Sequence, residues 1–312
     1  MPIPLSTGAS GNSPFINAGE ITNRGFEASI SYGNSVNDLD YQITGTFSSI
    51  DNEVDQLGTG SQQIFGGQPT HHGASATVTQ AGLPVGAFYL IETDGIFNSM
   101  EEVEAHASSG ELIQPNARPG DIRFVDYNND GQIDENDRHF IGSPNPDFTF
   151  GLGGNIQWKG FDMNLFFQGT YGNKIYNGLR QDLEGMNLEY NYSQSTLDSW
   201  TPQNQNTEIP RAVINDPNQN ARTSDRFLED GSYLRLKTLQ VGYTFSENLM
   251  ESLHVSNFRM YVSADNLFTI TDYSGFNPDI GRAGSVLDRG VDFGHIAYPL
   301  SRTFMVGLDI SF

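Results

Sequence analysis

Apolar and polar residues alternate one by one along many stretches of this 312-residue chain, and this pattern constrains the fold more than any other feature. Successive side chains of a β-strand point to opposite faces, so each stretch has one apolar and one polar face. The alternation runs through 26–32, 41–47, 148–158, 161–171, 258–264 and 304–312. It predicts an all-β fold of antiparallel strands.

The stretch 233–245 changes phase in its middle. Leu234 and Leu236 fall on one face, whereas Val241 and Tyr243 fall on the other. An extra residue in one strand produces such a change, so we expect a β-bulge near Lys237 or Thr238.

Short and long connections alternate between these stretches. Lys159-Gly160 predicts a tight hairpin, and 34–38 and 246–257 are also short. The remaining connections are long: 51–72, 94–147, 172–231 and 271–302. Long loops are uncommon in compact soluble domains, whereas outer-membrane barrels combine short periplasmic turns with long extracellular loops.

Strand direction requires an even number of strands between 41–50 and 148–158. Two candidates, 74–79 and 85–93, are joined at Leu83-Pro84 and bring the expected total to about nine. An odd set leaves an unpaired edge, which lipid cannot satisfy with hydrogen bonds. We therefore expect residues 1–312 to be the C-terminal section of a larger transmembrane barrel. A soluble β-sandwich or propeller is the alternative, because alternation alone does not identify what covers the apolar faces.

Composition excludes several other classes. The 38 acidic and 16 basic side chains give a net charge of -22, which disfavours nucleic acid. Cysteine is absent, which excludes disulfides and cysteine-based zinc sites. No run of 18 apolar residues predicts a transmembrane helix. The start, Met1-Pro2-Ile3-Pro4, lacks the features of a signal peptide, so any export signal is expected outside this sequence.

One motif predicts a metal site. The segment 126–137 has the spacing of a twelve-residue calcium loop, with Gly131 at the sharp turn. Its expected ligands are oxygens of Asp126, Asn128, Asp130, Gln132 through its backbone, Asp134 and Asp137. Ile133 is expected to anchor the loop in apolar packing. Asp137 is shorter than the usual Glu, and the alternative is an Asx-rich turn without metal. We expect a structural calcium ion.

Other candidate sites are weaker. His71-His72 is expected to be a surface pair, Glu101-Glu102 a solvated face, and Glu229-Asp230 a pair that positions a loop. No GxSxG, P-loop or GxGxxG context is present, so an enzyme is not expected. Tyr190, Tyr192 and Trp200 lie in a long loop and are candidates for sugar contacts. Lipid-facing aromatic girdles are expected from Trp158, Phe161, Tyr243, Phe245, Phe304 and Phe312.

Several motifs, in order, resemble the C-terminal third of SusC/RagA-type TonB-dependent outer-membrane transporters. They are 22–27 (TNRGFE), 119–142, 227–237 with 242–245 (GYTF), 261–268 (YVSADNLF) and 298–312. The resemblance implies a barrel of about 22 strands. It also implies import of glycan fragments, or in some members peptides, with a SusD-like surface lipoprotein. The family's signal peptide, plug, TonB-binding segment and early strands have no counterpart in this sequence.

The resemblance further implies the outer membrane of a Gram-negative, Bacteroidetes-like bacterium, with energy from the TonB complex. The alternative function is a secreted, calcium-stabilised β-protein that binds glycans or a cell surface. The two differ in the environment of the apolar strand faces, which contact lipid in a transporter and form a core in a soluble protein.

Overall fold

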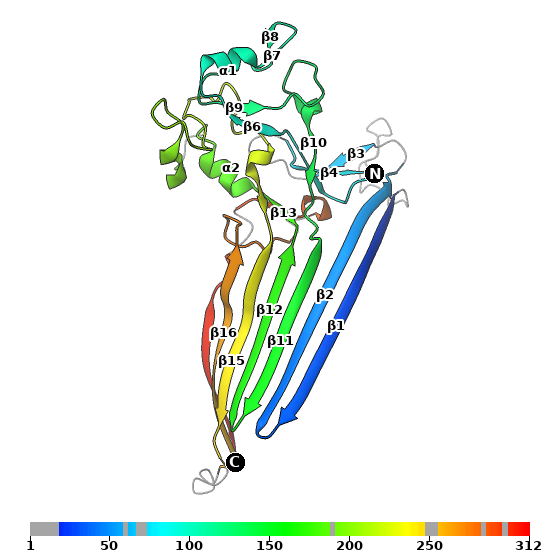
Figure 1. Ribbon diagram of the computed structural model, residues 1–312, viewed down its shortest axis with the longest axis vertical. Coiled ribbons are helices and arrows are strands. Elements are labelled where there is room, and N and C mark those ends of the chain that lie inside the picture. Colours follow the sequence, from blue (N-terminus) through cyan, green and yellow to red (C-terminus); the bar gives the residue numbers. More distant parts are fainter. Residues whose placement is uncertain are drawn as a thin grey trace, which may run out of the picture.

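Long antiparallel strands form a curved wall, and a domain built from their connections lies at one end of it (Figure 1). The computed structural model describes residues 19–58, 62–66, 74–187, 191–246, 255–281, 285–294 and 299–312. The wall is a seven-stranded sheet in the order β1-β2-β11-β12-β15-β16-β18. Its strands are β1 (Glu20–Val36), β2 (Leu39–Gln56), β11 (Phe148–Trp158), β12 (Phe161–Tyr171), β15 (Tyr233–Thr244), β16 (Asn257–Thr271) and β18 (Thr303–Ser311).

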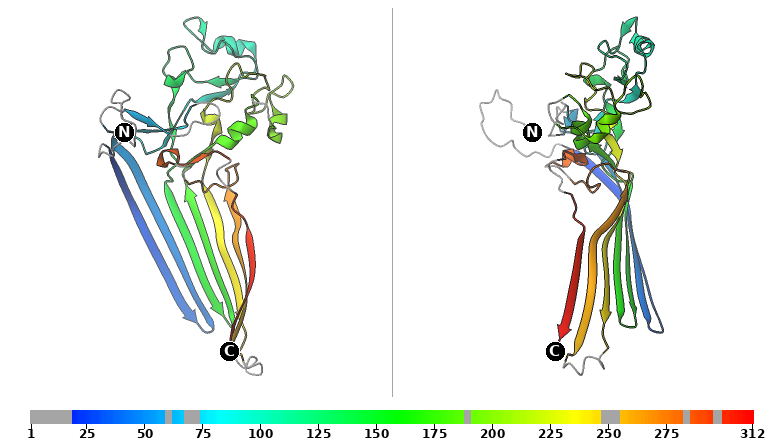
Figure 2. Two further views of the ribbon diagram at one scale, coloured as in Figure 1. Left: turned by 180° about the vertical axis from the view of Figure 1, so that it is seen from behind. Right: turned by 90° about the vertical axis from the view of Figure 1, so that its left-hand side faces the viewer.

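Two-residue turns join β1 to β2 and β11 to β12 at the end of the wall away from the domain. Lys159 and Gly160 have φ angles of 48° and 86°, the left-handed pair that a two-residue hairpin needs. The expected hairpin is therefore confirmed. At the other end, the connections β2–β11, β12–β15 and β16–β18 all enter one domain, which we call the loop domain (residues 57–147, 172–232 and 272–302, where described; Figure 2).

The expected count of nine wall strands is wrong. The segments proposed as two further strands form β4 (Thr77–Gln80) and β5 (Ala87–Leu90). These pair with β3 (Gln63–Phe65) and β10 (His139–Gly142) in a separate four-stranded sheet of the loop domain. Four residues are too few to cross a bilayer, which takes about 9–11 tilted residues. The expected directions of the wall strands are still correct, because removing two strands from between β2 and β11 leaves the direction of each remaining strand unchanged.

The expected bulge is confirmed. The pairing of β15 shifts register between Leu236 and Thr238 against β16, and the pairing with β12 shifts opposite Phe166 and Phe167. Lys237 is the additional residue. Leu236 and Leu239 therefore share a face, so the apolar side of β15 is continuous.

The register separates the wall into an apolar and a polar face. Val306 pairs with Val262, which pairs with Val241, which pairs with Met163, all on one face. The residues beside them, Met305, Ser263, Gln240 and Asn164, occupy the other. Large apolar side chains are exposed along the first face, for example Val306 at 76% and Ile30 at 75%. The apolar face therefore covers no core, which rules against a sandwich in the described part of the chain.

Aromatic rings gather near both ends of the apolar face. Near the turns, Phe161 contacts Tyr243, which contacts Phe245, which stacks on Phe258. Near the loop domain, Phe47 stacks on Phe148, which stacks on Tyr171. Two aromatic belts with aliphatic residues between them match a hydrocarbon layer with two interfaces.

The largest buried core lies in the loop domain. Tyr176 and Phe227, in edge-on contact, belong to a cluster with Phe88, Leu90 and Val291. Its members come from β5, β13 (Lys174–Asn177), η4 (Asp225–Phe227) and β17 (Val291–Asp292), together with Ala76 and Phe293. Ile141 of β10 and Leu228 of β14 (Leu228–Asp230) pack against them. The remaining elements are β6 (Thr93–Ile96), α1 (Met100–Ala105), β7 (Ala107–Ser108), β8 (Glu111–Leu112), β9 (Ile122–Phe124), η2 (Glu135–Asp137), α2 (Gly178–Glu184), η3 (Gln194–Asp198) and η6 (Val286–Asp288). Within the described residues, no helix has both the length and the apolar composition needed to span a membrane.

Candidate functional site

The first half of the calcium-type loop is organised around carboxylate and amide oxygens. Asp126 accepts hydrogen bonds from the backbone N–H groups of Asp130 (3.1 Å) and Gly131 (2.8 Å). Asn128 accepts from Asp130 N–H at 2.9 Å, and Asp130 accepts from Gln132 N–H at 3.0 Å. Gly131 makes the turn at a φ of 88°. The oxygens predicted at the first positions thus already order the loop through its own amides.

The second half of the loop is held by two aspartates. Asp134 caps η2, and Asp137 completes the capping box by accepting the Asp134 N–H at 2.7 Å. Asp137 is fully buried and also accepts from Tyr127 N–H at 3.0 Å. Its two oxygens therefore both have backbone partners. Across the part of the chain that the structure describes, no three His, Cys, Asp or Glu side chains converge closely enough to hold a metal.

The loop is fixed to the rest of the domain from both sides. Ile133 packs against the buried cluster of Ile91, Ile122 and Phe124, as expected from its position. Arg138, nearly buried, donates to the Tyr89 carbonyl at 2.9 Å and pairs with Glu135 at 2.9 Å. These contacts hold the loop against β5 and against the cluster around Phe124.

Calcium binding at this loop stays a prediction. An oxygen that accepts one hydrogen bond from a backbone N–H still has a lone pair with which it can coordinate a cation. Titration of the complete receptor with calcium should give binding that Asp126→Ala and Asp130→Ala abolish. The matched control is Glu135→Gln, which removes a largely exposed carboxylate of the same loop outside the predicted ligand positions. Equal binding in Asp126→Ala, Asp130→Ala and the native protein would contradict the prediction.

The aromatic candidates for sugar contact are not supported as a group. Trp200 is 7% exposed, and its indole N–H donates to Asn98 Oδ1 at 2.8 Å. It also packs against Gly120, where a Cβ would lie 2.5 Å from its ring. Trp200 is thus a core residue of the loop domain, and the expectation for it is wrong. Tyr192 is half-buried, and Tyr190 lies outside the described residues.

The three polar pairs singled out in the sequence have different outcomes. Glu229 accepts from Ser274 N–H at 2.8 Å and pairs with Arg180 at 3.3 Å, so it positions the chain after β16 as expected. Glu101 and Glu102 lie in the first turn of α1, where the pKa of Glu101 is lowered by hydrogen bonds to its backbone N–H and to Ser99. His71-His72 lies outside the described residues.

Buried charges join distant parts of the long loops. Arg211 forms a bidentate pair with the fully buried Asp121, at 2.8 and 3.0 Å. Arg226 pairs with Glu184 at 2.9 Å, and burial lowers the pKa of Arg226 to about 10, which leaves it charged at neutral pH. Burial also raises the pKa of Asp216, although two backbone N–H groups oppose the shift. These pairs were not found from the sequence, since their partners are far apart in it.

A second network lies on the polar face near the turns of the wall. Arg259 of β16 donates to Asp162 of β12 at 2.9 and 2.6 Å and to Asp309 of β18 at 3.0 Å. Its reach to β12 passes across Gly242 of β15. The guanidinium also lies over the ring of Tyr261. One side chain thus joins β16 to β12 and β18, and it crosses β15 in doing so.

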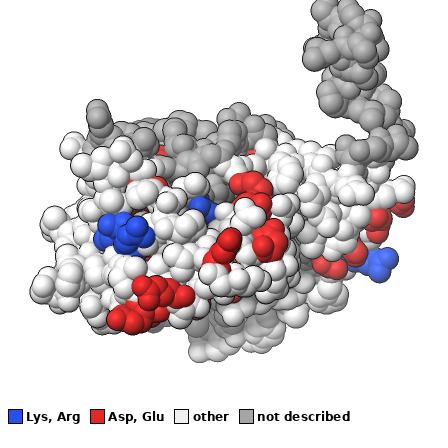
Figure 3. Space-filling view, turned by 90° about the horizontal axis from the view of Figure 1, so that it is seen from above, with Lys and Arg blue, Asp and Glu red and all other residues white. Residues whose placement is uncertain are grey.

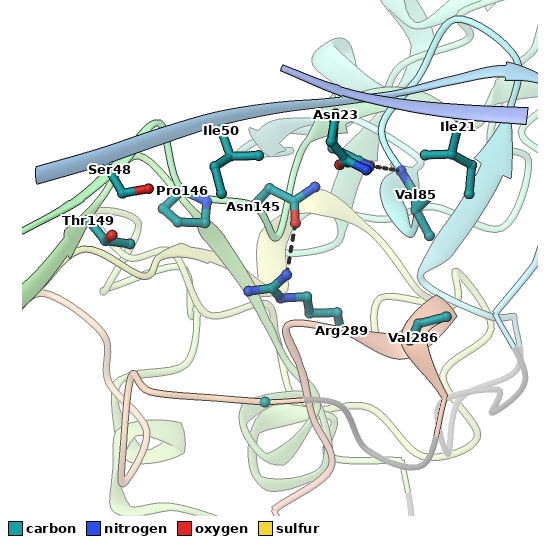
Figure 4. A pocket seen from close by; sticks show the side chains of 12 residues that line it. Ile21, Asn23, Ser48, Ile50, Val85, Asn145, Pro146, Thr149, Val286 and Arg289 are labelled. Carbon is teal, nitrogen blue, oxygen red and sulfur yellow. Dashed lines mark hydrogen bonds between the residues drawn. The ribbon is translucent and has the colours of Figure 1, made fainter. Parts of the chain in front are cut away.

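A cavity of about 740 Å³ lies where the polar face of the wall meets the loop domain. Side chains from β1, β2, the start of β11 and η6 surround it (Figure 4). Asn52 holds one side by accepting Val85 N–H at 2.8 Å, and Arg289 donates to Asn145 Oδ1 at 3.3 Å. The cavity was not predicted, because its residues come from five separate segments of the chain.

Comparison with known proteins agrees with this architecture. No family model matches the chain. TonB-dependent receptor P3 of Formosa agariphila is 34% identical over all of this chain and 30% of its own length. SusC of Bacteroides thetaiotaomicron is 26% identical over 95% of the chain and 27% of its own length. The solved structure of the RagAB peptide transporter superposes over the whole chain with a TM-score of 0.74 at 23% identity, covering 31% of that chain.

The chain thus spans about 30% of the length of the relatives that it matches. The matched region includes the wall and the loop domain, because the alignments run over nearly every residue. With its exposed apolar face between two aromatic belts, the chain belongs to the SusC/RagA family of TonB-dependent receptors of the bacterial outer membrane.

Proposed function

We propose that this chain forms part of the barrel wall and an extracellular loop domain of an outer-membrane nutrient importer. The observation that carries the proposal is the two-faced wall, apolar on one side and polar on the other, with every long connection packed into one domain at one end. A wall of this kind separates lipid from an aqueous lumen. The packed domain then stands at the outer entrance to the lumen.

The substrate proposed on family grounds is a nutrient such as a glycan oligosaccharide or a peptide. A SusD-like lipoprotein would close the entrance from outside, and the TonB complex would supply energy from the periplasm. Carboxylates form several small clusters on the visible face of the loop end, whereas Lys and Arg are sparse there (Figure 3). Such a surface suits partners without strong negative charge.

The alternative, a secreted glycan-binding β-protein, is less well supported. Val306, Ile30 and Phe26 expose 64–76% of their surface on the same face of the wall. In water, a contiguous apolar face of this kind leads to aggregation, whereas in a membrane the lipid chains cover it.

Gene deletion tests the proposal. Cells without the complete receptor should lose TonB-dependent uptake of one class of fluorescently labelled oligosaccharide or peptide. The native gene should restore uptake, and deletion of tonB should abolish it again. Uptake that is independent of both the receptor and TonB for every labelled substrate would contradict an importer.

A further inference from the structure

The cavity of about 740 Å³ interrupts the polar face of the wall with aliphatic side chains. Ile50 follows Ser48 on the same face of β2. Ile21 lies on the neighbouring strand β1, near the hydrogen bond between the side chains of Asn23 and Asn52. Val286 of η6 approaches from the loop domain. Ile21, Ile50 and Val286 are 52%, 51% and 56% exposed. They leave apolar surface open on a face where most strand positions carry polar side chains or glycine.

The charge of the cavity is opposite to that of the chain. Among the residues that the structure describes, Arg289 is its one charged lining residue, and no Asp or Glu lines it. The whole sequence, by contrast, has 38 acidic and 16 basic residues. Arg289 makes its hydrogen bond to Asn145, and no carboxylate of the described ranges lies within ion-pair distance of it. The cavity therefore offers a guanidinium to an anionic group.

The remaining lining distinguishes between ligand classes. No aromatic ring of the described part of the chain lines the cavity, so it lacks the flat surface on which a sugar ring packs. Asparagine side chains, by contrast, can donate to and accept from peptide amides. Open aliphatic surface, amides and one guanidinium complement a peptide better than an oligosaccharide.

We propose that this cavity binds a peptide segment in which an aliphatic side chain lies next to a carboxylate. The aliphatic group contacts Ile50 and Val286, and the carboxylate pairs with Arg289. The carboxylate is either the C-terminus of the peptide or an acidic side chain. This inference rests on the proposed function, because it names the substrate class of the proposed importer.

Calorimetric titration of the purified complete receptor tests the site with four probes. They are N-acetyl-Ala-Ala-Leu as the free acid, the same peptide as its C-terminal amide, N-acetyl-Ala-Asp-Leu amide, and tetragalacturonate. We expect the free acid, the Asp-containing amide or both to bind about tenfold more tightly than the uncharged amide. Which of the two anionic peptides binds identifies the source of the carboxylate. Tetragalacturonate, anionic but without an aliphatic group, should bind more weakly than the tighter peptide.

The variant Arg289→Gln should remove the preference for the anionic peptides over the uncharged amide. Arg289 is exposed, so the substitution should leave folding intact. The control Lys159→Gln removes a positive charge at the turn end of the wall and should change nothing. Equal binding of all peptides to the native receptor, tighter binding of tetragalacturonate, or no binding of any probe would overturn the proposal. The titration measures binding and not uptake, so the two proposals can fail separately. If the receptor binds the peptides but supports no TonB-dependent uptake, the proposal of an importer is contradicted and the proposal of a peptide site is not.

Discussion

Replacing Val306 by arginine is expected to prevent most of the receptor from assembling in the outer membrane. Val306 lies near the middle of β18, 76% exposed on the apolar face and paired with Val262. An arginine on the lipid face near the bilayer midplane costs about 2–4 kcal/mol. That range corresponds to a roughly 30- to 1,000-fold change in the folding equilibrium. The measurement is the fraction of folded barrel in the outer membrane, from its resistance to unfolding in unheated gel samples.

Met305→Arg is the matched control for this prediction. Met305 adjoins Val306 in the same strand but lies on the polar face, paired with Ser263. An arginine there would remain in the aqueous lumen, within reach of the carboxylate-bearing positions of β16 and β18. Assembly of Met305→Arg should stay close to the native level. Similar losses in the two variants would show that the faces of the wall are assigned wrongly.

The sequence predicted the wall well because its information is local. Alternation in 148–158 and 161–171, with Lys159-Gly160 between them, is enough to specify a hairpin, its register and its faces. The bulge at Lys237 was also predictable, since without an extra residue the apolar side chains of β15 would change from one face to the other in mid-strand. The family motifs predicted that the apolar face contacts lipid. Alternation alone does not distinguish contact with lipid from burial in a core.

The loop domain was less predictable for a physical reason. Phe88 and Leu90 alternate with other residues as wall strands do, but a buried four-residue strand and a short stretch of a membrane strand have the same pattern. Trp200 looked like a surface aromatic because it lies in a long connection. It is buried because that connection folds back on Gly120, a contact between distant segments that no local pattern encodes.

The candidate sites divide in the same way. The calcium-type loop was visible because all its oxygens lie within twelve consecutive residues. The cavity at Arg289 and the network at Arg259 each join residues more than 90 positions apart. Such sites follow from strand order, which the sequence does not give directly. A conspicuous glycine in an otherwise regular strand, such as Gly242, is the kind of local signal that could have pointed to one of them.

Replacing Gly242 by valine is expected to destabilise the barrel by about 3 kcal/mol, because it breaks the pair between Asp162 and Arg259. A Cβ at this position would lie 2.6 Å from Asp162 Oδ1 and 2.7 Å from Arg259 Nη2. The two charged groups bond to each other across β15 and are about one-quarter and one-fifth exposed. A side chain between them must separate them. Each would then lose a charge-assisted partner in a site only partly open to water.

A double-mutant cycle distinguishes this cause from a general effect of valine on the strand. In an Arg259→Met background the pair is already absent, so adding Gly242→Val should cost less than about 1 kcal/mol. Gly45→Val is the control substitution, since a Cβ at Gly45 of β2 meets no atom within 4 Å. It should leave stability unchanged or slightly raise it, because valine favours strands. The measurement is the free energy of unfolding from urea titration of the complete receptor in lipid vesicles. If the costs of Gly242→Val and Arg259→Met simply add, Gly242 does not serve to let Arg259 reach across β15.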